Sequence, residues 1–217
     1  FTAFCIAVSM DPLPEEPTAP AWQAAMVPGV LNGTDQEQAG EDGTAKALLD
    51  LAYRLKGKLL LPSMDTFSSA SAIWNMAAPV PLAIVEAADE NDVVETMKLL
   101  ERFPDLEFTI RSGGHHILGY SSVANGLVLS LSDVNSISVD DKGVFTMGPG
   151  ARVQEVVHAT LPQGWGTVVG ICGLVAEGGH SLAGGIGYLT RKYGLAADNV
   201  VSYNVVLHNG SLVTASH

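Results

Sequence analysis

The chain has 217 residues, of which 47% are hydrophobic and 16% charged, a balance typical of a globular protein. Its formal net charge is −12 at pH 7, which argues against nucleic acid or an anionic membrane surface as a partner, because both need clustered Lys and Arg. No apolar run approaches the ~20 residues that span a bilayer. With two cysteines and no CxxC or HExxH motif, we also expect no metal site.

Residues 1–40 show no sustained hydrophobic period and are predicted to be a leader and linker. The first nine residues are apolar or small, as at the end of a secretory signal, and sequons at Asn32 and Asn209 would suit a secreted chain. We therefore expect secretion or passage through the secretory pathway. A stray apolar N-terminus is the alternative.

A helical lead-in is predicted over residues 41–78. Leucines recur on one side of residues 44–55 and predict an amphipathic helix there. A short strand follows at 58–61, stopped by Pro62, and a second short helix is expected over 66–74.

A second region, 79–217, opens with a β-α-β unit. A strand over 82–85 is followed by a helix capped by Asp89 and running to Phe103, and then by a strand over 107–110. The default for such a unit is a pair of parallel strands joined by a right-handed crossover.

The later part of this region alternates between short strands and helices. Strands over 127–129, 137–139 and 144–147 are predicted to form an antiparallel set. Helices are predicted over 152–161 and near 181–189. Asn209-Gly210 is the strongest short hairpin signal, and predicts a turn between strands over 200–207 and 212–214.

The segment from Arg111 to Tyr120, Arg-Ser-Gly-Gly-His-His-Ile-Leu-Gly-Tyr, directly follows a predicted strand. Glycines let main-chain N–H groups converge on an anion, and Arg and Ser side chains also bind phosphate. The segment therefore predicts a diphosphate cradle, with candidate binding residues Arg111, Ser112, Gly113, Gly114, His115 and Gly119. A solvent-facing turn with an incidental histidine pair is the alternative on these residues alone.

A second glycine-rich stretch carries the only thiol outside the suspected leader, Cys172, and further candidates at Gly178, Gly179, His180, Gly184, Gly185 and Gly187. Two such loops in one domain indicate a long ligand with a diphosphate in its middle. The GxGxxG motif of dinucleotide-binding Rossmann folds and the GxxxxGK[ST] phosphate loop are absent from the sequence, so conventional NAD or ATP binding is disfavoured.

From Gly57 to Thr214 the sequence resembles the flavin-binding domain of the berberine bridge enzyme-like oxidoreductases, within the group typified by vanillyl-alcohol oxidase and para-cresol methylhydroxylase (PCMH). The motifs that carry this resemblance are GKLLLP (57–62), PLAIV (81–85), RSGGH (111–115), GLVLSLS (126–132), GPGA (148–151), GGH (178–180), GGIG (184–187) and RKYGLAADN (191–199). The resemblance implies an α+β fold of the PCMH type, in which FAD lies between two α+β subdomains.

The resemblance also implies roles for single residues. The loop at 111–119 would grip the diphosphate, and His115 aligns with the histidine that family members join to the flavin 8α carbon. A neutral imidazole suits this bond as a nucleophile. Cys172 aligns with the cysteine of doubly linked members, with a buried structural cysteine as the alternative. Asp198 and Asn199 would flank the cofactor, although Asp198 equally suits a helix-end cap.

The implied activity is that of an FAD-dependent oxidase. An alcohol, carbohydrate or activated C–H substrate would give a hydride to FAD, and the electrons would pass to O₂. We expect the substrate base, the end of the flavin domain and the substrate domain to lie outside this chain. Two alternatives stay open: a truncated, catalytically idle flavin-fold binding module, and a flavoenzyme like the sugar-lactone oxidases, with a single histidine link.

Overall fold

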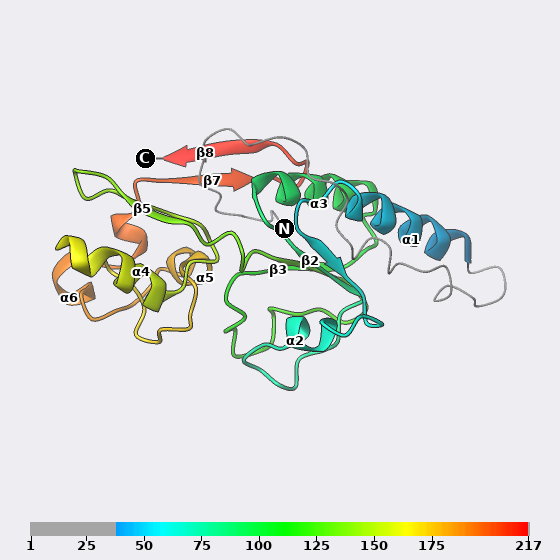
Figure 1. Ribbon diagram of the computed structural model, residues 1–217, viewed down its shortest axis with the longest axis horizontal. Coiled ribbons are helices and arrows are strands. Elements are labelled where there is room, and N and C mark those ends of the chain that lie inside the picture. Colours follow the sequence, from blue (N-terminus) through cyan, green and yellow to red (C-terminus); the bar gives the residue numbers. More distant parts are fainter. Residues whose placement is uncertain (1–37, 217) are drawn as a thin grey trace.

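A four-stranded sheet forms the centre of the N-terminal half of the protein. The computed structural model describes residues 38–216 (Figure 1), so Cys5 and most of the predicted leader lie outside the described residues. The strands are β1 (Lys58–Leu60), β2 (Ala83–Glu86), β3 (Phe108–Arg111) and β4 (Leu127–Ser130), in the spatial order β1-β2-β4-β3. β1 is antiparallel to β2, and the other pairs are parallel.

The predicted β-α-β unit is confirmed as a pair of parallel strands, but β4 lies between its two strands. The prediction that β4 joins an antiparallel set was wrong. Its four residues, Leu-Val-Leu-Ser, are all buried, as expected of a central parallel strand covered on both faces.

Helices cover both faces of this sheet. α1 (Gln38–Ala52) and α3 (Glu90–Arg102) lie side by side over one face (Figure 1), where their apolar side chains pack on Val85 and Leu129. On the other face, Phe67 of α2 (Phe67–Ser71) packs on Ile84 and Val128. The alternation of side chains along β2 and β4 therefore fills two cores.

The C-terminal half contains two hairpins and several short helices. Its elements are β5 (Ile137–Val139), β6 (Phe145–Met147), α4 (Val153–Thr160), a 3₁₀ turn at Leu161–Gln163, α5 (Glu177–Leu182), α6 (Thr190–Tyr193), a 3₁₀ turn at Ala197–Asn199, β7 (Ser202–Val206) and β8 (Leu212–Ser216). β5 pairs with β6, and β7 with β8, both antiparallel. The hairpin predicted from Asn209-Gly210 is confirmed, and Gly210 takes the left-handed φ of 78° that this turn needs.

Three predicted helices have different bounds. α1 begins at Gln38, before the predicted start at residue 44. α2 is shorter than the predicted 66–74, because the chain turns extended at Ala72 and the Trp74 N–H donates to Gly114 O. The helix predicted near 181–189 was wrong, because left-handed glycines at 184 and 185 end α5.

Asp92 ties the start of α3 to the segment before β1. Its buried carboxylate accepts hydrogen bonds from the N–H groups of Lys56, Gly57 and Ala88, each at 2.8 Å. Burial raises the pKa of Asp92 and these three N–H groups lower it. The side chain thus holds the segments that precede β1 and follow β2 against the start of α3.

In the described range 38–216, no helix combines the length and the apolar character that crossing a bilayer requires.

We predict that Asp92→Ala lowers the free energy of unfolding by about 2 kcal/mol or more, because three part-buried N–H groups lose their charged acceptor. Urea unfolding followed by circular dichroism measures this loss. Asp50→Ala, on the exposed side of α1, is the control and should stay within about 0.5 kcal/mol of the parent. Equal stabilities for the two variants would contradict the role given to Asp92.

Candidate functional site

The two glycine-rich loops meet and enclose a cavity of about 390 Å³. Seven of the predicted binding residues line it: Ser112, Gly113, Gly114, His115, Gly178, Gly179 and His180. The first loop leaves the carboxyl end of β3, and the second runs into α5. Residues far apart in the sequence are therefore brought together as the motifs predicted.

The contact between the loops runs through Pro149. Its carbonyl oxygen accepts hydrogen bonds from Ser112 Oγ and, at 3.0 Å, from the Gly178 N–H. Gly113 touches the second loop so closely that a Cβ there would lie 2.8 Å from Ala176 N. Only glycine allows this approach, because the obstructing atom belongs to the backbone.

Several main-chain N–H groups around this cavity have no acceptor. Within residues 38–216, no hydrogen bond is found for the N–H of Gly113, Gly114, His115 or Gly179. A Cβ at Gly179 would meet no atom within 4 Å, so the backbone there is open. Converging N–H groups make an anion site, and here no Lys or Arg side chain lines the cavity.

The two adjacent histidines differ in their surroundings. His115 is half-buried, lines the cavity and makes no hydrogen bond within the described residues. His116 stacks on Tyr120 with ring centroids 4.6 Å apart, and its Nδ1 accepts the Leu118 N–H at 3.2 Å. Both imidazoles line the cavity, and of the two only His115 makes no hydrogen bond within the described residues.

Some predicted phosphate contacts are occupied elsewhere or lie outside the cavity. The guanidinium of Arg111 is buried and does not line it; burial lowers the pKa of Arg111, and the nearby Glu86 raises it. The Ser112 hydroxyl is taken by Pro149 O. Gly119 also lies outside the lining and takes a left-handed φ of 77°.

Cys172 lies in the loop before α5, and its side chain is exposed and free. It does not line the cavity that His115 lines. The alternative of a buried, structural cysteine was wrong, because the thiol faces solvent.

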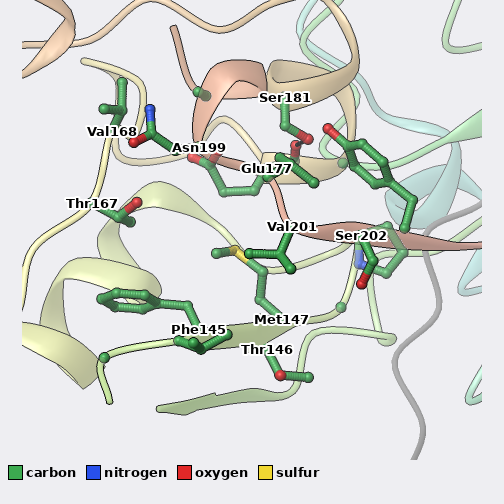
Figure 2. A pocket seen from close by; sticks show the side chains of 18 of the residues that line it. Phe145, Thr146, Met147, Thr167, Val168, Glu177, Ser181, Asn199, Val201 and Ser202 are labelled. Atoms are coloured by element: carbon green, nitrogen blue, oxygen red, sulfur yellow. Dashed lines mark hydrogen bonds between the residues drawn. The ribbon is translucent and has the colours of Figure 1, made fainter. Parts of the chain in front are cut away.

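Figure 2 shows a second cavity, of about 530 Å³. Pro149 and Gly178 line both cavities. β6, β7 and α5 contribute to the walls of the second cavity, and so does Asn199. Asp198 lies outside the lining; its carboxylate accepts the Leu195 N–H at 2.8 Å, which fits the cap interpretation.

The remaining predicted glycines, Gly184, Gly185 and Gly187, line neither of these two cavities and shape the turn after α5. The carbonyls of Gly184 and Gly185 accept the N–H groups of Ala197 and Ala196, both at 2.9 Å. The Gly187 N–H donates to Thr190 Oγ1 at 2.8 Å. These contacts hold the turn against the segment 195–199.

Glu177 is a buried group at the boundary of the two cavities that the motifs did not single out for binding. Its Oε2 lies 2.9 Å from His180 Nδ1, and the two side chains are 6% and 11% exposed. His180 Nε2 lies 3.1 Å from Ile186 O, so this nitrogen must donate. Burial raises the pKa of Glu177, while His180 lowers it. The Glu-x-x-His spacing on one helical turn was the available signal.

This arrangement fits an elongated ligand with an anionic middle. Unpaired N–H groups and the His115 imidazole line the smaller cavity, and Pro149 and Gly178 line both cavities. In the part of the chain that the structure describes, no group of three or more His, Cys, Asp or Glu side chains is arranged to hold a metal ion.

Comparisons with known proteins identify FAD as a ligand of this kind. The model of a family described as "FAD binding domain" matches residues 81–216. FAD-linked oxidoreductase pgmH of Aspergillus terreus is 32% identical over 187 residues, which cover 82% of this chain and 38% of that protein. (R)-6-hydroxynicotine oxidase of Paenarthrobacter nicotinovorans is 31% identical over 75% of this chain and 36% of its own length.

Solved structures share the fold. 6-Hydroxy-D-nicotine oxidase from Arthrobacter nicotinovorans superposes with a TM-score of 0.70 at 31% identity, over 75% of this chain and 36% of that one. A chitooligosaccharide oxidase gives a TM-score of 0.72 at 26% identity, over 78% and 37%. The chain thus spans well under half the length of these relatives. Its α+β fold is of the PCMH type, and the chain belongs to the FAD binding domain family, among the berberine bridge enzyme-like FAD-linked oxidoreductases.

Proposed function

We propose that this chain is the FAD-holding part of an oxidase that binds its flavin covalently. The observation that carries the proposal is the set of unpaired N–H groups at Gly113, Gly114 and His115 around one cavity. A diphosphate needs such donors, and a chain with a net charge of −12 supplies them here from its backbone. The names of the relatives, which include two oxidases, support the same activity.

The glycine loops would hold the diphosphate, and His115 would lie against the isoalloxazine. FAD, when bound, accepts a hydride from a substrate and passes the electrons to O₂. The protein supplies the position, orientation and surroundings of that ring. The ring nitrogens of His115 make no hydrogen bond to described residues, so a lone pair is free for the bond to the flavin 8α carbon.

Cys172 would form a second bond to the flavin. Its thiol is exposed and free, and therefore open to a large ring, while the loop that carries it leads into the glycine pair at 178–179. The alternative, a single link through His115, corresponds to an enzyme like the sugar-lactone oxidases.

The substrate class is inferred from the relatives' names alone. Nicotine derivatives and oligosaccharides are the substrates named there, which indicates an alcohol, a carbohydrate or an activated C–H bond for this protein. The base that accepts the substrate proton is expected outside these 217 residues. A catalytically idle flavin-binding module remains the competing proposal, and turnover separates the two.

We predict that the full-length protein expressed with FAD stays yellow after acid precipitation, and that His115→Ala combined with Cys172→Ser removes all of this acid-stable colour. His116→Ala is the matched control and should keep the colour, because His116 is held by Tyr120 and Leu118. Absorbance of the redissolved pellet near the flavin maximum is the measurement. Acid-stable colour in the double variant would refute attachment through these two residues.

We predict that proteolysis of the holoprotein releases one flavin-bearing product that contains both the His115 and the Cys172 segments. In Cys172→Ser the flavin should remain on the His115 peptide alone. Mass spectrometry of the yellow fraction distinguishes the two. A wild-type product with the His115 segment only would establish the single link.

We predict that the full-length holoprotein releases hydrogen peroxide, one molecule for each substrate molecule oxidised, with an oligosaccharide or an aromatic alcohol. A peroxidase-coupled assay measures it, with flavin-free protein as the control. Substrate oxidation with an artificial acceptor but without peroxide would indicate a dehydrogenase. Absence of turnover with every acceptor would support the idle module.

A further inference from the structure

The turn between β7 and β8 carries an Asn-Gly-Ser triplet that the proposed flavin site does not use. Asn209, Gly210 and Ser211 line neither of the two cavities. An Asn-x-Ser triplet is the acceptor sequence for N-linked glycans, but Asn-Gly is also a common hairpin turn. The contacts of each side chain decide whether the triplet does more than make the turn.

The turn itself is made by the main chain and by Gly210. The Gly210 N–H donates to Leu207 O at 2.9 Å, and the Leu207 N–H donates to Ser211 O at 2.8 Å. Gly210 is buried beside α3 (Figure 1), where a Cβ would lie 2.7 Å from Lys98 Cγ. Asn209 Oδ1 accepts the Ser211 N–H at 3.0 Å, an Asx-turn that fixes the direction of the side-chain amide. The turn therefore needs neither the amide nitrogen of Asn209 nor the hydroxyl of Ser211.

These two groups are the ones that N-glycosylation needs, and both are free. Asn209 and Ser211 are exposed. Within residues 38–216, no hydrogen bond is found for Asn209 Nδ2 or for Ser211 Oγ. The side chains of Asn75 and Asn199, by contrast, each donate Nδ2 to main-chain carbonyls. The fold thus uses the amide oxygen of Asn209 and leaves its nitrogen, the atom that bonds to a sugar, without a partner among the described residues.

We propose that Asn209 carries an N-linked glycan. Nδ2 forms a bond to C1 of the first sugar of a lipid-linked oligosaccharide, and the bond from C1 to the lipid diphosphate breaks. The diphosphate leaves with the electron pair, and the amide nitrogen loses one proton. The enzyme that transfers the sugar requires the hydroxyl at the third position of the triplet, which Ser211 supplies.

The glycan requires entry into the secretory pathway, which the apolar start of the sequence also indicates. A sugar chain is bulky and has to extend into solvent, as the exposed tip of this hairpin allows. The inference does not depend on the proposed function, because Asn209 lies outside both cavities.

The first test expresses the full-length protein, with its own N-terminus, in a eukaryotic host. Enzymatic removal of N-linked glycans in heavy-oxygen water converts each glycosylated Asn to labelled Asp, and mass spectrometry of the peptides then locates the label. We expect the label at position 209 in most molecules, whatever the state of the other triplet, at Asn32. An unlabelled position 209, in secreted protein or in protein kept inside the cell, would overturn the inference and leave the proposed function intact.

Three variants separate the glycan from the turn. Ser211→Ala and Asn209→Asp should both abolish the sugar at this position, while Asp keeps the oxygen that accepts the Ser211 N–H. Both should match the deglycosylated parent in thermal unfolding and in acid-stable flavin. Ser211→Thr keeps the hydroxyl, is the matched control and should keep the sugar. Sugar at Asn209 in Ser211→Ala, or its loss in Ser211→Thr, would contradict the inference.

Discussion

One carbonyl oxygen, that of Pro149, connects the two loops on which the site depends. It accepts Ser112 Oγ from the loop after β3 and the Gly178 N–H from the start of α5. These donors lie in the two halves of the protein, so the hydrogen bonds fix the distance across the site. With that distance set, N–H groups of both loops line the smaller cavity, and Pro149 lines the larger cavity as well.

No Lys or Arg side chain lines the smaller cavity, which is consistent with the strongly acidic composition of the chain. A strongly acidic protein that used lysines for its anion would surround each of them with competing carboxylates. Backbone N–H groups escape such competition, because their direction is set by the fold. Arg111, the nearest candidate cation, is buried behind the loop instead of in it.

Short sequence patterns correctly predicted those elements whose structure depends on contacts between neighbouring residues. The helix from Asp89 to Phe103 was found from its cap, the hairpin from Asn209-Gly210, and the anion loop from the glycines after β3. The place of β4 was missed, because short apolar strands look alike whether their partners are parallel or antiparallel. The prediction of a helix near 181–189 was wrong because the left-handed glycines at 184 and 185 end α5. The contact between the buried side chains of Glu177 and His180 was missed, because it depends on packing.

The tight approach of Gly113 to Ala176 also constrains how the sequence can evolve. A side chain at 113 would meet a backbone nitrogen 2.8 Å away, and no exchange of the residue at 176 removes that atom. Packed positions usually change together by compensating pairs of substitutions. Such a pair cannot replace Gly113, because the obstructing atom belongs to the backbone. Descendants of this chain that keep the site must keep glycine there, whatever happens to the residue it touches.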